Sequence, residues 1–71
     1  MGTMGLTQAD RDAIESMMDR AGVSEFLTVV QEVCNEKAEH VLTNWQDKGL
    51  ARDWRLLADK VSRAAEFAGG M

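Results

Sequence analysis

Two runs of apolar residues, spaced by three and four positions, extend over much of the chain and constrain its fold more than any other feature. The first runs from Leu27 to Trp45 and the second from Leu50 to Ala68, with Gly49 in the interruption between them. This spacing places side chains on one face of an α-helix. The sequence therefore predicts two long amphipathic helices that form an antiparallel hairpin about a short turn.

A shorter helix is predicted before the hairpin. Thr7 stands three residues before Asp10, as in a capping box, and Gly22 follows the last residue of the apolar pattern, where a helix C-cap is expected. Ser24 provides a second start signal, for the long helix. The apolar side chains of the short helix are Ala13, Ile14, Met17, Met18 and Ala21. The predicted helices cover about residues 8–20, 25–47 and 50–68, and the predicted loose ends are residues 1–5 and 69–71.

The core is expected where the apolar stripes of the three helices meet. The first half of the long helix carries a wider apolar face than its second half, so the short helix is expected to cover this wide end. Two forms of the hairpin turn remain open, one with Asp47 as the N-cap of the last helix and one with Gly49 as the residue that ends the helix before it. The expected stripe of the last helix consists of Leu50, Trp54, Leu57, Val61, Ala64 and Ala68.

The composition agrees with a single all-α domain. Of the 71 residues, 45% are hydrophobic and 28% charged, and the chain has no proline or tyrosine, which disfavours both disorder and a many-stranded β fold. A chain this short buries only a limited share of its apolar surface by itself. We therefore expect an all-α three-helix bundle, in which the short N-terminal helix packs on the long antiparallel hairpin, and we expect the bundle to form a homodimer.

Charge and hydropathy exclude several classes of function. The net charge is −4, so the chain repels nucleic acid and anionic lipid surfaces. No apolar run reaches the roughly 18 residues that a membrane span needs. The single cysteine forms no internal disulfide, and the amino-terminal residues lack the basic and apolar blocks of a signal peptide. These features predict a cytoplasmic protein without a nucleic-acid or membrane partner.

The long helix carries an acidic edge that has the residue types of a metal site. Glu32, Glu36 and Glu39 follow one another at helical spacing, and His40 comes directly after them. Di-iron helical bundles use Glu-x-x-His, whereas the residue three positions before His40 is Lys37. We therefore predict solvated acids, with no metal and no cofactor. The alternative is a metal-binding helical bundle in which two chains pool these carboxylates and His40.

Nucleophilic catalysis has little support in this sequence. Cys34 and His40 stand six residues apart, which leaves their side chains on different faces of a helix with 3.6 residues per turn. Cys34 also lies on the apolar stripe, so we expect it to be a small buried hydrophobe. The sequence therefore predicts that this chain is not an enzyme.

Two tryptophans flank the predicted turn and permit two interpretations. Trp45 and Trp54 lie on the expected core stripes, so they either plug the end of the hairpin or provide an exposed contact for a partner. A second line on the last helix lies off the expected stripe and consists of Arg52, Leu56, Lys60, Arg63 and Phe67. Either the short helix packs against part of this line, or the line is free to bind an acidic partner.

By elimination, the sequence predicts a small acidic interaction or regulatory module that self-associates and binds a protein partner. Residues 50–68 carry four bases and three acids, whereas residues 7–22 carry two bases and four acids, so the last helix is the better surface for an acidic partner. The candidate partner-binding residues are Trp45, Trp54, Arg52, Leu56, Lys60, Arg63 and Phe67.

Overall fold

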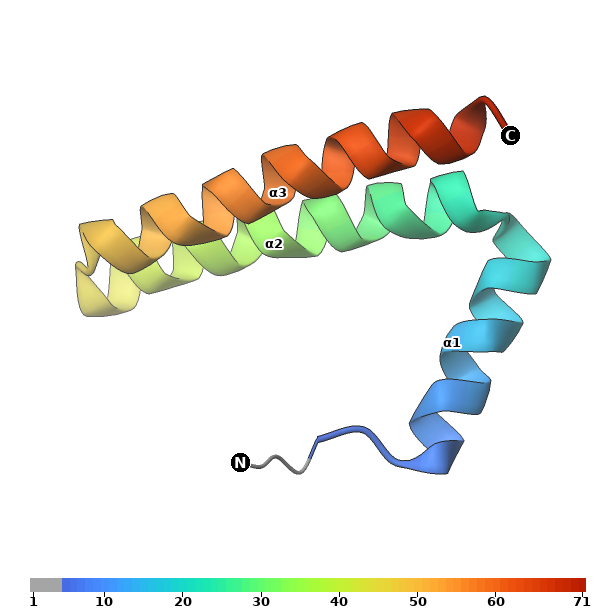
Figure 1. Cartoon of the computed structure of the whole chain (residues 1–71). Helices are drawn as coiled ribbons and strands as arrows, with labels where there is room; N and C mark the ends of the chain where they lie inside the picture. The colour runs from blue at the N-terminus through green and yellow to red at the C-terminus, as the bar shows by residue number, and fades with distance from the viewer. Residues whose placement is uncertain (1–4) are drawn as a thin grey trace.

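The computed structural model describes residues 5–71, and within this range the chain forms three α-helices (Figure 1). They are α1 (Gln8–Ala21), α2 (Val23–Trp45) and α3 (Lys48–Gly69). α2 and α3 lie side by side and antiparallel, and α1 contacts α2. The predicted all-α, three-helix architecture with its helical hairpin is confirmed. No helix of this described range is both long and apolar enough to cross a membrane.

The carboxyl end of the chain and the starts of the hairpin helices differ by one or two residues from the sequence prediction. Residues 1–4 of the amino-terminal end lie outside the described residues. α3 continues through Gly69, so the expected carboxyl-terminal loose end begins one residue later than predicted. Both helices of the hairpin also begin two residues earlier than predicted, at Val23 and Lys48.

The capping box predicted for α1 is present. The Thr7 hydroxyl accepts a hydrogen bond from the Asp10 amide (3.1 Å), and the Asp10 carboxylate accepts one from the Thr7 amide (3.0 Å). The hydrogen bonds from the backbone and then the hydroxyl of Thr7 hold the pKa of Asp10 below its ordinary value, because they stabilise the charged carboxylate. The carboxylate half of this cap therefore persists at neutral pH and weakens as the pH falls through that lowered pKa, whereas the bond from the Asp10 amide to the Thr7 hydroxyl does not depend on it.

The hairpin turn uses Asp47 and not Gly49. The Asp47 side chain accepts a hydrogen bond from the Leu50 amide (2.9 Å), which makes Asp47 the N-cap of α3. Gln46 ends α2 in the left-handed conformation, with φ of 53°, so the position expected for a glycine is held by a glutamine. Gly49 lies inside the first turn of α3. The structure thus decides between the two forms of the turn that the sequence left open.

Ser24 does not cap α2, contrary to the sequence prediction. α2 begins at Val23 without a side-chain cap, and the Ser24 hydroxyl donates a hydrogen bond across the hairpin to the Ala65 carbonyl (2.9 Å). The two helices approach closely here, because a Cβ atom at Gly69 would lie only 3.3 Å from the Ser24 Oγ. A tertiary contact has therefore replaced the local cap.

The core of the hairpin is built from small side chains. On α3 the buried residues are Ala51, Ala58 and Ala65, which repeat every seven positions. On α2 the buried residues are Cys34, Ala38 and Val41. The expected core stripe of α3 is wrong at three of its six positions, because Leu50, Leu57 and Ala64 are exposed while Trp54, Val61 and Ala68 are half-buried. The helices meet along the alanines, where the small side chains let their axes come close.

This choice of core limits the free energy that the hairpin gains by folding. Burying a methyl-sized group contributes about 0.8 kcal/mol, against roughly 1.5–3 kcal/mol for a fully buried leucine or phenylalanine. No large side chain of the described chain is fully buried. Half-buried side chains along the edges of the contact, such as Leu27, Trp54 and Val61, must therefore supply much of the stabilisation.

α1 leads away from the hairpin instead of lying along it (Figure 1). It meets α2 at Gly22 and does not contact α3. None of its residues is buried. The wide apolar end of α2 is consequently covered only where the two helices meet, and Val29 and Val33 remain exposed.

We predict that enlarging a core alanine destabilises the hairpin. Ala58→Leu should lower the free energy of unfolding by at least about 1–3 kcal/mol, because the extra carbons have no space between α2 and α3. Urea unfolding followed by far-UV circular dichroism measures this loss. Ala64→Leu adds the same atoms at an exposed position of α3 and should not destabilise. Equal losses for the two variants would contradict the alanine core.

Candidate functional site

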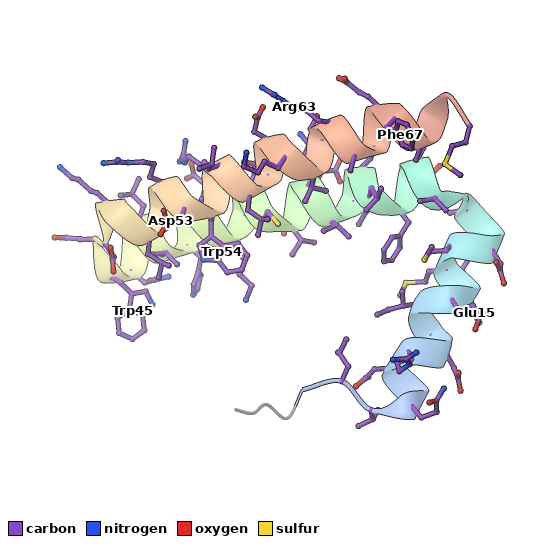
Figure 2. All side chains as sticks on the ribbon, viewed as in Figure 1. Glu15, Trp45, Asp53, Trp54, Arg63 and Phe67 are labelled. Carbon is purple, nitrogen blue, oxygen red and sulfur yellow. The ribbon has the colours of Figure 1, made fainter. Side chains whose placement is uncertain are left out.

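The two tryptophans at the closed end of the hairpin differ in exposure. Trp45, the last residue of α2, is 73% exposed, so the interpretation as a core plug is wrong for this residue. Trp54 lies on α3 and is half-buried. Figure 2 shows both indoles on the same side of the hairpin. They place a large aromatic surface where a partner can reach it.

The second line of residues on α3 is exposed along its whole length, and we call it the outer line. It consists of Arg52, Leu56, Lys60, Arg63 and Phe67. Leu56 and Phe67 are its apolar members, and Phe67 is 77% exposed. Because α1 does not contact α3, the expectation that α1 packs against this line is wrong. The outer line combines three positive charges with two large apolar side chains on one open helix face.

The ion pairs near the outer line are exposed to solvent. Arg63 forms an ion pair with Asp59 one turn earlier on α3 (3.3 Å), and both side chains are largely exposed. A pair of this kind contributes little to stability, since water screens both charges. Arg55 lies on a different face and reaches across to Glu39 of α2 (3.1 Å). The guanidinium of Arg63 therefore stays available to a negatively charged partner, while that of Arg55 joins the two helices.

The acidic edge of α2 does not assemble into a metal site within one chain. No group of three or more histidine, cysteine, aspartate or glutamate side chains in residues 5–71 is arranged to share an ion. Glu39 is paired with Arg55. The Asn44 side-chain nitrogen lies 3.0 Å from Nδ1 of His40 and also donates to the His40 carbonyl. These partners occupy two of the four residues that the metal-binding alternative requires.

Cys34 is buried between the helices, whereas His40 is exposed. The expectation that the cysteine is a small buried hydrophobe is confirmed, and its thiol is free. The imidazole and the thiol face different surroundings and do not form a catalytic pair. The pair therefore offers no arrangement for nucleophilic chemistry.

A second apolar surface escaped the sequence analysis, and we call it the inner face of the hairpin. Arg55–Glu39 and Ser24–Ala65 mark one side of the hairpin, and the helical spacing places large apolar residues of both helices along the opposite side. They are Phe26 and Val33 of α2 and Leu50, Trp54 and Leu57 of α3. A shallow, almost wholly apolar depression lies between Leu50, Asp53, Trp54 and Leu57. The repeat of alanine every seven residues was the signal that these larger residues flank the core.

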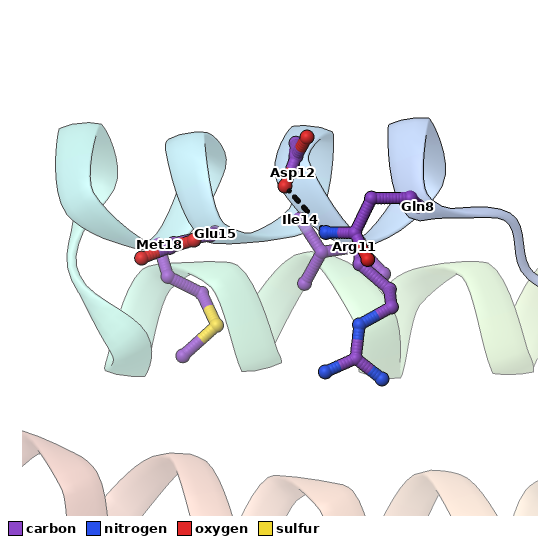
Figure 3. A pocket seen from close by; sticks show the side chains of 6 residues that line it. All are labelled: Gln8, Arg11, Asp12, Ile14, Glu15 and Met18. Carbon is purple, nitrogen blue, oxygen red and sulfur yellow. Dashed lines mark hydrogen bonds between the residues drawn. The ribbon is translucent and has the colours of Figure 1, made fainter.

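α1 carries an apolar face of its own beside an open depression. Ile14 and Met18 project from one side of the helix, and Asp12, which accepts a hydrogen bond from Gln8 (2.9 Å), lies on the other (Figure 3). Met17 extends the apolar side and is exposed. The depression has mixed polar and apolar walls and no cluster of groups suited to catalysis. The apolar face is the more informative feature, because Ile14 and Met18 are only half-buried and no residue of α1 is fully buried.

We expect metal ions to leave the folded chain unaffected. Adding Zn²⁺ or Fe²⁺ should not change the melting temperature, because exposed carboxylates on one helix bind first-row ions weakly. Thermal unfolding with and without the ion tests this. A rise of several degrees that disappears in His40→Ala would support the metal-binding alternative instead.

Comparison of the chain with protein-family models, with curated proteins and with solved structures finds no match. The arrangement of the chain's own residues is therefore the basis for assigning a function.

Proposed function

We propose that this chain is a small non-enzymatic module that acts by binding protein surfaces and by associating with itself. One observation carries the proposal: large apolar side chains lie on the surface of α3, while alanines fill its core. Isolated apolar residues on a surface are ordinary, but several large ones along one open helix of a small domain favour an interaction site. The proposed compartment is the cytoplasm, where a free thiol such as that of Cys34 stays reduced.

The outer line and the closed end of the hairpin form the proposed surface for a second protein. Phe67, Leu56 and Trp45 are residue types that supply binding energy when a partner buries them. Arg52, Lys60 and Arg63 lie beside Leu56 and Phe67 on α3. The partner that fits this surface is an acidic one with apolar side chains between its carboxylates, because such a surface complements both features.

The absence of enzymatic activity in this proposal rests on the placement of the reactive groups. The free thiol of Cys34 is enclosed between α2 and α3, and the imidazole of His40 faces solvent beside Asn44. Catalysis by a nucleophile requires a base within hydrogen-bonding reach of it. The exposed aromatic and basic residues of α3 are the stronger indication of what the chain does.

We predict that Arg63→Glu weakens partner binding without unfolding the chain. The free energy of unfolding should change by less than about 0.5 kcal/mol, because Arg63 is exposed and its only ion pair is a surface one. Proteins captured from an extract of the native host by the wild-type chain should be depleted on the variant. Quantitative mass spectrometry measures the depletion, and urea unfolding measures the stability.

Arg20→Glu is the matched control, since it makes the same change of charge at an exposed position of α1. It should capture the same proteins as the wild type. Phe67→Ala tests the apolar component of the outer line and should deplete the same proteins as Arg63→Glu. If all three variants capture equally, the outer line is not the binding surface.

A further inference from the structure

The link between α1 and α2 is a single residue. Gly22 adopts φ of 92° and ψ of 153°, its amide donates to the Met18 carbonyl (2.8 Å), and its carbonyl accepts from the Phe26 amide (3.0 Å). The carboxyl end of α1 and the amino end of α2 are therefore both hydrogen-bonded to this one residue. Two antiparallel helices need a connection of about two to five residues. α1 is thus unable to fold back along its own hairpin unless one of the helices unwinds.

α1 nevertheless needs a packing partner. None of its 14 residues is fully buried, Ile14 and Met18 are only half-buried, and a helix of this length is marginally stable in water without tertiary packing. Ile14, Met17 and Met18 form its apolar face. The one-residue link prevents this face from packing on the hairpin of the same chain. The surface that covers it must therefore come from another molecule.

The inner face of the hairpin is the matching surface. α1 projects toward the side of the hairpin on which Trp45 and Trp54 lie, and Glu15 lies on the side of α1 that is turned away from the hairpin (Figure 2). The chain thus has two apolar faces that border the inside of one angle. Leu50 and Leu57 of the inner face are both 44% exposed, and Ile14 and Met18 of α1 are only half-buried, so both faces keep accessible apolar surface in a single chain.

The exposed area agrees with a missing partner. The chain exposes 5494 Å², whereas a compact monomer of its mass exposes about 4,400 Å². The excess, about 1,100 Å², includes the exposed ends of the chain, such as Leu6 and Met71, as well as the uncovered faces. A standard protein interface buries about 800 Å² on each partner. The excess is thus an upper limit on the area of the uncovered faces, and this limit leaves room for an interface of standard size.

We propose that two copies of this chain form a dimer by exchanging α1, so that the α1 of each copy packs on the inner face of the other. Ile14, Met17 and Met18 then lie against Leu50, Trp54 and Leu57 of the opposite copy. The contact is symmetric and occurs twice, so it closes without leaving a free face. The inference specifies the self-association in the proposed function, and it uses a surface separate from the outer line, although Trp54 belongs to both the inner face and the closed end of the hairpin.

Charge favours α3 of the second copy over α2 as the neighbour of α1. α1 carries four acids and two bases, and α3 carries five bases and three acids. α2 carries four acids and one base. Opposite net charges on facing helices guide association and fix its orientation. Most bases of α3 lie on the outer line and at Arg55, and Asp53 borders the depression of the inner face, so charge steers the approach to α3, whereas apolar contacts select its inner face.

The length of the link provides the decisive test. Sedimentation at tens of micromolar should give twice the chain mass of 7.9 kDa for the wild type. Inserting about four glycine and serine residues after Gly22 brings the link into the range of helical hairpins, so that α1 can pack on its own hairpin. The insertion should convert the dimer to a monomer that keeps its helical content. A dimer of unchanged affinity after the insertion would overturn the exchange.

Two substitutions on α1 separate its faces. Ile14→Asp places a charge on the apolar face and should raise the dissociation constant of the dimer more than about tenfold, the weakening expected for a central contact. Ser16→Asp adds the same charge on the opposite side of α1 and should leave the constant within about twofold. If both variants dimerise like the wild type, α1 is not in the interface.

A direct measurement applies even if a variant fails to fold. In an equal mixture of ¹³C-labelled and unlabelled wild-type chains, isotope-filtered NOEs should connect the methyl groups of Ile14 in one copy to the indole of Trp54 in the other. A wild-type chain that stays monomeric overturns the exchange but leaves binding by the outer line intact. A dimer with these NOEs whose Arg63→Glu variant loses no captured protein retains the exchange and removes the proposed partner surface.

Discussion

The close antiparallel packing of α2 on α3 is the interaction on which the rest of the molecule depends. Ala51, Ala58 and Ala65 repeat every seven residues on α3 and meet small residues of α2. Because the two helices approach along their smallest side chains, larger ones are displaced to the edges of the contact. The same geometry that forms the hairpin therefore creates the inner face and leaves the outer line open.

A layer of two packed helices leaves much of its apolar surface exposed. Each helix buries one narrow strip, and only a third element can shield the apolar residues beside that strip. α1 has the apolar face to do so, yet the single residue between α1 and α2 holds it away from its own hairpin. The connection, and not the composition of α1, is what leaves the surface uncovered. The proposed association between copies would cover this surface without any change in the helices.

Much of the secondary structure was predictable because it depends on local chemistry. The capping box of Thr7 and Asp10 and the positive φ of Gly22 involve residues close together in the chain, so the residue types alone identify them. Ser24 shows where such reasoning fails. Its hydroxyl is a plausible cap, but a carbonyl 41 positions away offers a better partner in the folded hairpin, and no local pattern reveals that contact.

The core of α3 was mispredicted for a related reason. Two heptad stripes run side by side on this helix, one of large residues through Leu50 and Leu57 and one of alanines through Ala51 and Ala58. Both have the spacing of a buried seam, and residue size favours the first, since large apolar side chains gain more by burial. Which stripe is buried depends on how close the helices lie, and that is a property of the pair. The exposure of Trp45 has a similar origin, because it depends on where α2 ends, and α2 ends at this residue.

The sequence by itself determined the number of helices, their approximate ends, the hairpin between α2 and α3 and the burial of Cys34, because apolar periodicity and capping residues act over a few positions. Only the tertiary structure decided which side of α3 packs and in which direction α1 leaves the hairpin. The physical reason is that helix separation and the angle at Gly22 arise from contacts and backbone torsions of the folded chain. The outer line was visible in the sequence, whereas its freedom from α1 and the existence of the inner face were visible only in the fold.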